Sequence, residues 1–239
     1  MYQFETRIRY SEVDKNGRLT LPGMLNYFQD VCTFQSEDAG VGTLYLRRKG
    51  LAWVLNAWQI DILKTPVLCD AVQVATIPYD MKGFLGYRNF CMKDSRTGEV
   101  LAVANSIWTM MDLEKQRPCR VPEEIMQAYE LSERLDMEYA KRKILLEGEG
   151  RKEGNIVVLA HHLDTNRHVN NGQYVQMAMD FLKPDTLVVR MRAEYKKSAV
   201  LSDVIVPVVY ERKDILGIAL NNSKEETFAI IEFHTTTGD

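Results

Sequence analysis

The residues best suited to chemistry lie in one polar stretch of the second half of the chain, residues 161–171. This stretch reads HHLDTNRHVNN and holds three of the four histidines. Within it Asp164, Asn166 and His168 follow one another at intervals of two residues. An imidazole beside a carboxylate and an amide can move a proton and stabilise a developing negative charge. These residues are therefore candidates for acid–base catalysis, such as the hydrolysis of an activated ester.

Other interpretations of this stretch are weaker. Asp and Asn residues form turns and cap helices, which accounts for Asn170 or Asn171. A metal site could use the three histidines and Asp164, but no HExxH pattern and no cysteine ligand occurs there, so no metal is predicted. The chain also has no GxSxG motif and no convincing phosphate-binding glycine loop. No cofactor is expected.

The polar stretch has a counterpart in the first half of the chain. Residues 13–18 (VDKNGR) align with residues 163–168 (LDTNRH) at an offset of 150, and residues 67–70 (VLCD) align with residues 200–203 (VLSD) at an offset of 133. Two matches separated by one insertion indicate an internal duplication. Arg18 replaces the histidine in the first copy, and an arginine cannot serve as a general base near neutral pH.

The elements around the two stretches also repeat. Alternating apolar residues predict a strand near the N-terminus, and Thr20 begins a predicted helix that ends near Ser36. Residues 51–111 contain four β-rich segments, and the order strand, loop, helix, strands recurs after Gly154. We expect an α+β fold of two units, residues 1–120 and 151–239, each with a long helix packed on an antiparallel sheet. A charged helical linker is predicted over residues 121–150. This arrangement resembles two tandem hotdog domains.

The sequence LDTNRHVNNGQY (163–174) resembles the active-site loop of the acyl-ACP thioesterase family. That family has two tandem hotdog domains and a D-x-N-x-H-x-N-N motif in the second. The resemblance implies that Asp164, Asn166 and His168 are catalytic. It adds a glutamate from the next long strand, here Glu194. Some plant members carry a cysteine directly after that glutamate; Tyr195 stands there, so a cysteine nucleophile is excluded at this position.

The resemblance also implies the function: hydrolysis of the thioester of fatty acyl-acyl carrier protein, which releases free fatty acid and ends chain elongation. The phosphopantetheine arm arrives with the substrate. In the expected mechanism Glu194, with His168, activates a water molecule. The first unit would bind the acyl chain and the second would cleave it. The residues expected to contact the substrate are Trp53, Trp58, Met24, Phe28, Arg190 and Arg192.

The charge balance restricts the partners of the chain. It has 30 basic and 33 acidic residues among 239, a net charge of −3, which excludes a polycation built for nucleic acid. An acidic carrier protein must therefore dock on a local patch, such as 47–49, 115–120 or 190–197. The longest uncharged stretch, Val100 to Met111, has 12 residues, too few for a membrane span of roughly 20. Four scattered cysteines and no signal sequence indicate the cytoplasm, and a homodimer is left open.

Three alternative functions are compatible with this fold. An acyl-CoA thioesterase uses similar carboxylates but usually has one hotdog per chain. A hotdog dehydratase pairs one histidine with one acid and would leave Asn166 without a role. A non-catalytic acyl-binding regulator would need a DNA-binding appendage, and the sequence shows no such pattern.

Overall fold

The computed structural model describes residues 1–184 and 186–236, which form two compact units. The first unit comprises Met1–Asn56 and Ile62–Tyr139, and the second comprises Ala57–Asp61 and Ala140–Asp239. Strand β2 (Leu51–Ile62) thus contributes residues to both. The sequence predicts a first domain that ends at residue 120 and a second that begins at residue 151. In the structure the chain passes from the first unit to the second between Tyr139 and Ala140. None of the helices in the described ranges is long and apolar enough to cross a bilayer.

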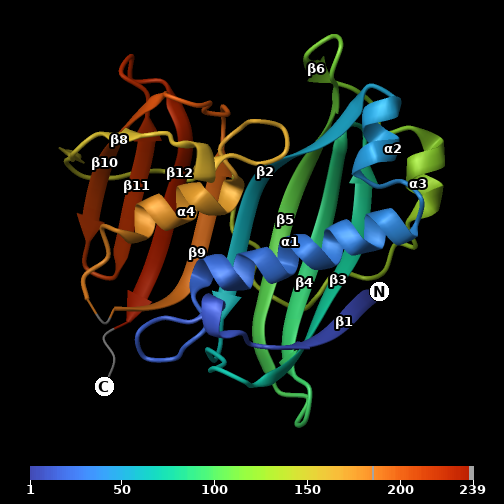
Figure 1. The fold of residues 1–239 in the computed structure, drawn as a ribbon, viewed down its shortest axis with the longest axis horizontal. Coiled ribbons are helices and arrows are strands. Elements are labelled where there is room, and N and C mark those ends of the chain that lie inside the picture. The colour runs from blue at the N-terminus through green and yellow to red at the C-terminus, as the bar shows by residue number, and fades with distance from the viewer. Residues whose placement is uncertain (185, 237–239) are drawn as a thin grey trace. The chain divides into compact units, whose positions relative to one another are not determined.

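The first unit is an antiparallel sheet with a long helix lying across one face (Figure 1). Its strands run in the order β1-β3-β4-β5-β2, and β6 pairs with β5. Its elements besides β2 are β1 (Tyr2–Arg7), α1 (Leu21–Asp38), α2 (Thr43–Arg48), β3 (Ala71–Lys82), β4 (Leu85–Asp94), β5 (Val100–Asp112), β6 (Arg117–Pro118) and α3 (Glu123–Ala128). The Oγ1 atom of Thr20 accepts the Gly23 N–H at 3.2 Å, which confirms the predicted start of the long helix. Its apolar side packs on the sheet, where the Phe28 and Phe90 rings lie 5.3 Å apart.

The second unit repeats this plan with a shorter helix (Figure 1). Residues Ala57–Asp61 of β2 pair with β9, and the order continues through β12, β11, β10 and β7, with β8 pairing with β10. The elements are β7 (Arg151–Lys152), β8 (Ile156–Val157), α4 (Asn171–Met179), β9 (Leu187–Tyr195), β10 (Val204–Arg212), β11 (Ile215–Asn221) and β12 (Thr227–Thr236). The Asn170 side chain caps α4 by accepting the Gly172 N–H at 2.8 Å.

The charged segment between the units differs from the prediction. Only α3 is helical, and residues 130–147, here called the connecting segment, form neither helix nor strand. In the first unit the side chain of Asn89 accepts the Leu135 N–H at 3.0 Å and the Tyr139 hydroxyl at 2.9 Å.

The same pattern continues in the second unit, where Gln59 accepts the Ala140 N–H at 2.9 Å and Glu194 accepts the Ile144 N–H at 3.1 Å. A helix would use these backbone groups internally and leave buried polar side chains of the sheets without partners. The predicted helix fails beyond Ala128 for this reason.

Candidate active site

The polar loop before α4 is built around one carboxylate. The Oδ1 atom of Asp164 accepts the N–H of Asn166 at 2.7 Å and the N–H of His168 at 3.1 Å. The Asp164 N–H in turn donates to the His168 carbonyl at 2.8 Å, and Arg167 adopts a left-handed φ of 63°. Asp164 therefore acts as a turn-forming residue. The turn leaves the side chains of Asn166 and His168 exposed at its tip.

This turn is joined to the segment that follows β9. The N–H of Val169, directly after His168, donates to the Ala199 carbonyl at 2.9 Å, and His168 forms an isolated β-bridge with Val200. Helix α4 begins at Asn171, so the tip lies within a few residues of a helix N-terminus. The amides of a first helical turn carry partial positive charge and suit a developing oxyanion.

The other two histidines of the stretch have a different environment. The Nδ1 atom of His162 accepts the Leu159 N–H at 3.0 Å. The His161 and His162 rings lie 4.2 Å apart. Burial, with His161 close by, lowers the pKa of His162 below its usual value and favours the neutral acceptor. Within the described ranges, no cluster of three or more His, Cys or acidic residues is arranged to hold a metal ion.

The first unit contains the same turn. The Oδ1 atom of Asp14 accepts the N–H of Asn16 at 2.8 Å and the N–H of Arg18 at 2.9 Å, and Gly17 has a φ of 73°. The next residue, Leu19, donates its N–H to the Pro66 carbonyl at 2.9 Å, as Val169 does to Ala199. The repeat found in the sequence thus extends to individual hydrogen bonds. The first copy builds the turn without the histidine.

Glu194 is buried and hydrogen-bonded to the connecting segment. Its side chain is 9% exposed and its Oε2 atom accepts the Ile144 N–H. The next residue, Tyr195, donates its hydroxyl to the Asn171 carbonyl at 3.1 Å, which places Tyr195 on the face covered by α4. Because neighbouring residues of a strand point to opposite faces, Glu194 points to the other face, toward the connecting segment. The structure brings Asp164, Asn166 and His168 together in one turn, and the catalytic part of Glu194 stays a prediction.

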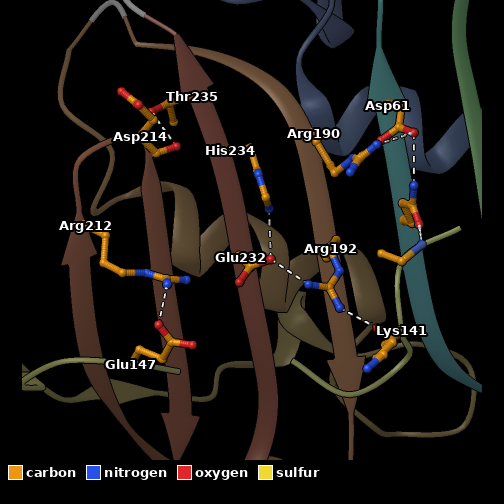
Figure 2. Close-up of polar contacts among 12 residues, drawn as sticks. Asp61, Lys141, Glu147, Arg190, Arg192, Arg212, Asp214, Glu232, His234 and Thr235 are labelled. Atoms are coloured by element: carbon orange, nitrogen blue, oxygen red, sulfur yellow. Dashed lines mark hydrogen bonds and ion pairs between the residues drawn. The ribbon is translucent and has the colours of Figure 1, made fainter. Parts of the chain in front are cut away.

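Arg190 and Arg192 share that second face of β9 and are both ion-paired (Figure 2). The Nε atom of Arg190 lies 2.5 Å from Asp61 Oδ1, and Nη1 of Arg192 lies 2.7 Å from Glu232 Oε1. Arg192 also donates to the Lys141 carbonyl at 2.5 Å, so it binds the connecting segment. Their side chains are 21% and 15% exposed, and their charges are locally compensated. This does not match the open positive patch expected for an acidic carrier.

Sequence reasoning missed both acidic partners. At the offset of 133, Asp61 is the counterpart of Glu194, but the strand register sets it opposite Arg190. Glu232 and His234 interrupt the apolar strand β12 at alternate positions, and that alternation was the available signal. The Nε2 atom of His234 lies 3.0 Å from Glu232 Oε1. Burial raises the pKa of Glu232, but His234 and Arg192 outweigh it and hold the pKa below its ordinary value.

Comparison with known families decides the relationship of this chain. Residues 1–129, more than half of the chain, match the family model for the acyl-ACP thioesterase N-terminal domain. The chain belongs to the acyl-ACP thioesterase family. It is 31% identical over 135 residues to the chloroplastic oleoyl-acyl carrier protein thioesterase 2 of Arabidopsis thaliana, covering 54% of this chain and 36% of that one.

Solved structures show the same family fold. An acyl-ACP thioesterase from Bacteroides thetaiotaomicron superposes with a TM-score of 0.90 at 20% identity, covering 98% of this chain and 97% of that one. The 12:0-ACP thioesterase of Umbellularia californica gives 0.87 at 19% identity, with 99% and 97% covered. At these identities the likeness establishes the fold alone. The chain spans about half the length of the curated relatives it matches, 47% and 46% in two of them.

The apolar residues predicted to contact substrate in this acyl-ACP thioesterase family member are mostly core residues. Met24 and Phe28, on the buried side of α1, are 1% and 0% exposed. Trp53 lies against Gly86, where an added Cβ would meet its ring at 3.1 Å. Trp58 is 2% exposed in the second unit. Their part in holding an acyl chain stays a prediction.

The contacts of Glu232 with Arg192 and His234 predict that the free energy of unfolding depends on pH. Replacing Glu232 by Gln leaves the Arg192 guanidinium without its counter-charge and should cost about 3 kcal/mol of unfolding free energy at pH 7. The pKa of Glu232 is lower in the folded than in the unfolded chain. The contribution is therefore complete above the ordinary value of 4.5 and is lost as the pH falls through the lowered folded value.

Urea unfolding of wild type and Glu232→Gln between pH 7 and pH 3 tests this dependence. The free energies of unfolding of the two proteins should approach each other as the pH falls toward 3. Glu225→Gln is the control, because its partner Lys152 lies 2.9 Å away in an exposed pair. A constant difference between wild type and Glu232→Gln over the whole range would contradict the assignment.

Proposed function

We propose that this protein hydrolyses the thioester bond of fatty acyl-acyl carrier protein, releasing a free fatty acid and leaving the phosphopantetheine thiol on the carrier. One observation supports this most directly: the turn that presents Asn166 and His168 beside the start of α4. Family membership supports the substrate class, since relatives such as the Arabidopsis thaliana protein are named acyl carrier protein thioesterases. No cofactor is needed for this reaction.

The proposed chemistry uses one water molecule. His168 takes a proton from the water as its oxygen attacks the thioester carbonyl carbon. Asn166 and the partial positive charge at the start of α4 stabilise the oxyanion. The carbon–sulfur bond then breaks, and the thiolate takes up the proton held by His168. Direct attack by Asp164, which would form an anhydride, is disfavoured because its Oδ1 already accepts two backbone N–H groups.

Glu194 has two candidate roles. The family resemblance assigns it to water activation, whereas its hydrogen bond to Ile144 assigns it to the connecting segment. We favour the second role for this chain, because its carboxylate lies on the sheet face opposite Tyr195. In that role Glu194 stabilises the second unit and acts on the reaction only indirectly.

The domain arrangement belongs to the same proposal. The repeated turns and sheets support two tandem hotdog domains, with residues 1–120 binding the acyl chain and residues 151–239 carrying the catalytic turn. The carrier would dock on an exposed basic run, and residues 47–49 and 115–120 of the first unit are the candidates. Within them, Lys49 and Lys115 form exposed ion pairs with Glu124 and Asp112, which a docked carrier would have to replace. A cytoplasmic location and a homodimer stay predictions.

An acyl-CoA thioesterase is the second candidate function, and one assay separates the two. Thiol release is measured from palmitoyl-carrier protein and from palmitoyl-CoA. We expect faster release from the carrier substrate and a loss of about 10²–10⁴-fold in kcat for His168→Ala, because a general base is removed. His161→Ala, in the same loop, is the matched control and should retain the wild-type kcat.

The remaining outcomes are equally informative. Equal or faster release from palmitoyl-CoA would move the function to the acyl-CoA class. No release from either substrate across several chain lengths would favour a dehydratase or an acyl-binding protein.

Glu194→Gln distinguishes the two roles of that residue. A glutamine oxygen can still accept the Ile144 N–H, so we expect kcat within about fivefold of wild type. A general base would instead cost about 10²–10⁴-fold. The readout is kcat on the carrier substrate, with circular dichroism to confirm folding. A loss of a hundredfold or more in folded protein would return Glu194 to the catalytic set.

The duplicated turn provides an internal control for Asp164. Asp164→Ala and Asp14→Ala each remove an acceptor of two backbone N–H groups, so both should lower the unfolding free energy by a similar amount, about 1–3 kcal/mol. Only Asp164→Ala should also lower kcat, by at least tenfold at a temperature where both variants are folded. An equal loss of activity in the two variants would show that the effect comes from stability.

A further inference from the structure

Two tyrosine hydroxyls of the second unit contact the framework of the catalytic turn. Tyr195, the last residue of β9, donates its hydroxyl to the carbonyl of Asn171 at 3.1 Å. Tyr174, in the first turns of α4, accepts the Ala199 N–H on its hydroxyl at 2.8 Å. The two rings lie 6.0 Å apart. Together they join the helix start to the segment after β9.

These bonds form a continuous path to His168. Both backbone polar groups of Ala199 are hydrogen-bonded. Its N–H donates to the Tyr174 hydroxyl, and its carbonyl accepts the Val169 N–H at 2.9 Å. Val169 directly follows His168. Ala199 is fully buried, so no water is available to replace a lost partner. Displacing either tyrosine hydroxyl would therefore change the backbone that carries the imidazole.

The first copy shows that the turn does not need these hydroxyls. At the offset of 150 the counterpart of Tyr174 is Met24, and at the offset of 133 the counterparts of Tyr195 and Ala199 are Ile62 and Pro66. Proline has no N–H to donate and methionine has no hydroxyl to accept one. The Asp14 turn and its bond from Leu19 to Pro66 nevertheless form. The tyrosine bonds occur only in the copy that carries the histidine.

We infer that Tyr174 and Tyr195 are positioning residues, which fix the His168 turn relative to the start of α4 so that imidazole and oxyanion donors act on one carbonyl group. The inference rests on the proposed hydrolytic function. Burial raises the pKa of Tyr174 to about 12, and burial likewise raises that of Tyr195, so both hydroxyls stay protonated at neutral pH. Neither tyrosine touches the reacting atoms in this scheme.

Tyr195→Phe and Tyr174→Phe test the inference, since each removes one hydroxyl and keeps the ring. We expect kcat to fall about fivefold to tenfold for Tyr195→Phe, with KM within twofold. Tyr174→Phe should lose more, because it leaves the buried Ala199 N–H without an acceptor. The pH profile of kcat/KM should also change, since the environment of the proposed base is altered.

Tyr27→Phe is the matched control in the first unit. Tyr27 lies on the buried side of α1, and its hydroxyl donates to Glu12 Oε2 at 2.5 Å, with the Arg7 carbonyl at 3.2 Å. Both partners belong to the first unit, whereas the His168 bonds described above lie in the second. Tyr27→Phe should leave kcat, KM and the pH profile at wild-type values. An equal fall of kcat in Tyr27→Phe would show that the hydroxyls act through general stability and would overturn the inference.

A second readout separates this inference from the proposed function. In NMR spectra of the full chain, the ring proton signals of His168 should shift or broaden in Tyr174→Phe and Tyr195→Phe and stay unchanged in Tyr27→Phe. If wild type fails to hydrolyse any acyl substrate, the proposed function fails while this test still decides the positioning. Wild-type spectra together with wild-type kinetics in both second-unit variants would overturn the inference.

Discussion

Buried polar groups must find hydrogen-bond partners, and this requirement shapes the structure more than any single apolar contact. One face of each sheet carries polar side chains where an ordinary core would be apolar, notably Asn89, Gln59 and Glu194. Each accepts a backbone N–H of the connecting segment. The connecting segment does not form a helix, because its backbone N–H groups donate to these side chains. Its charged sequence keeps its other side in water.

The duplication separates the requirements of folding from those of chemistry. Both copies keep the aspartate that accepts two backbone N–H groups and the backbone bond to the segment after the next long strand. These shared features are what the turn needs in order to form. The second copy alone adds His168 at the tip and two tyrosine hydroxyls behind it. Features confined to one copy are the stronger indicators of function.

The sequence predicted those parts of the fold that depend on local chemistry. The Thr20 cap and the repeated order of elements follow from side chains that act within a few residues. The turn-forming role of Asp164 was not predicted, because its spacing from Asn166 and His168 favoured a catalytic role. The connecting segment was mistaken for a helix because its partners lie far away in the chain: Asn89 is 46 residues from Leu135, and Glu194 is 50 residues from Ile144. Strand register likewise decided that Asp61 opposes Arg190, which no local pattern contains.

The position of Glu194 shows how the alternation of a strand decides which face of the sheet a side chain serves. Alternate side chains of a strand point to opposite faces of the sheet. A shift of one residue in an alignment therefore assigns a side chain to the wrong face. Tyr195 lies on the face of α4 and Glu194 on the face of the connecting segment. Arg190 and Arg192 lie on the same face of β9 as Glu194, and their ion pairs are formed on that face. The polar residues of β9 on this face therefore stabilise the sheet and the connecting segment, and the chemistry proposed for this chain rests on the turn before α4.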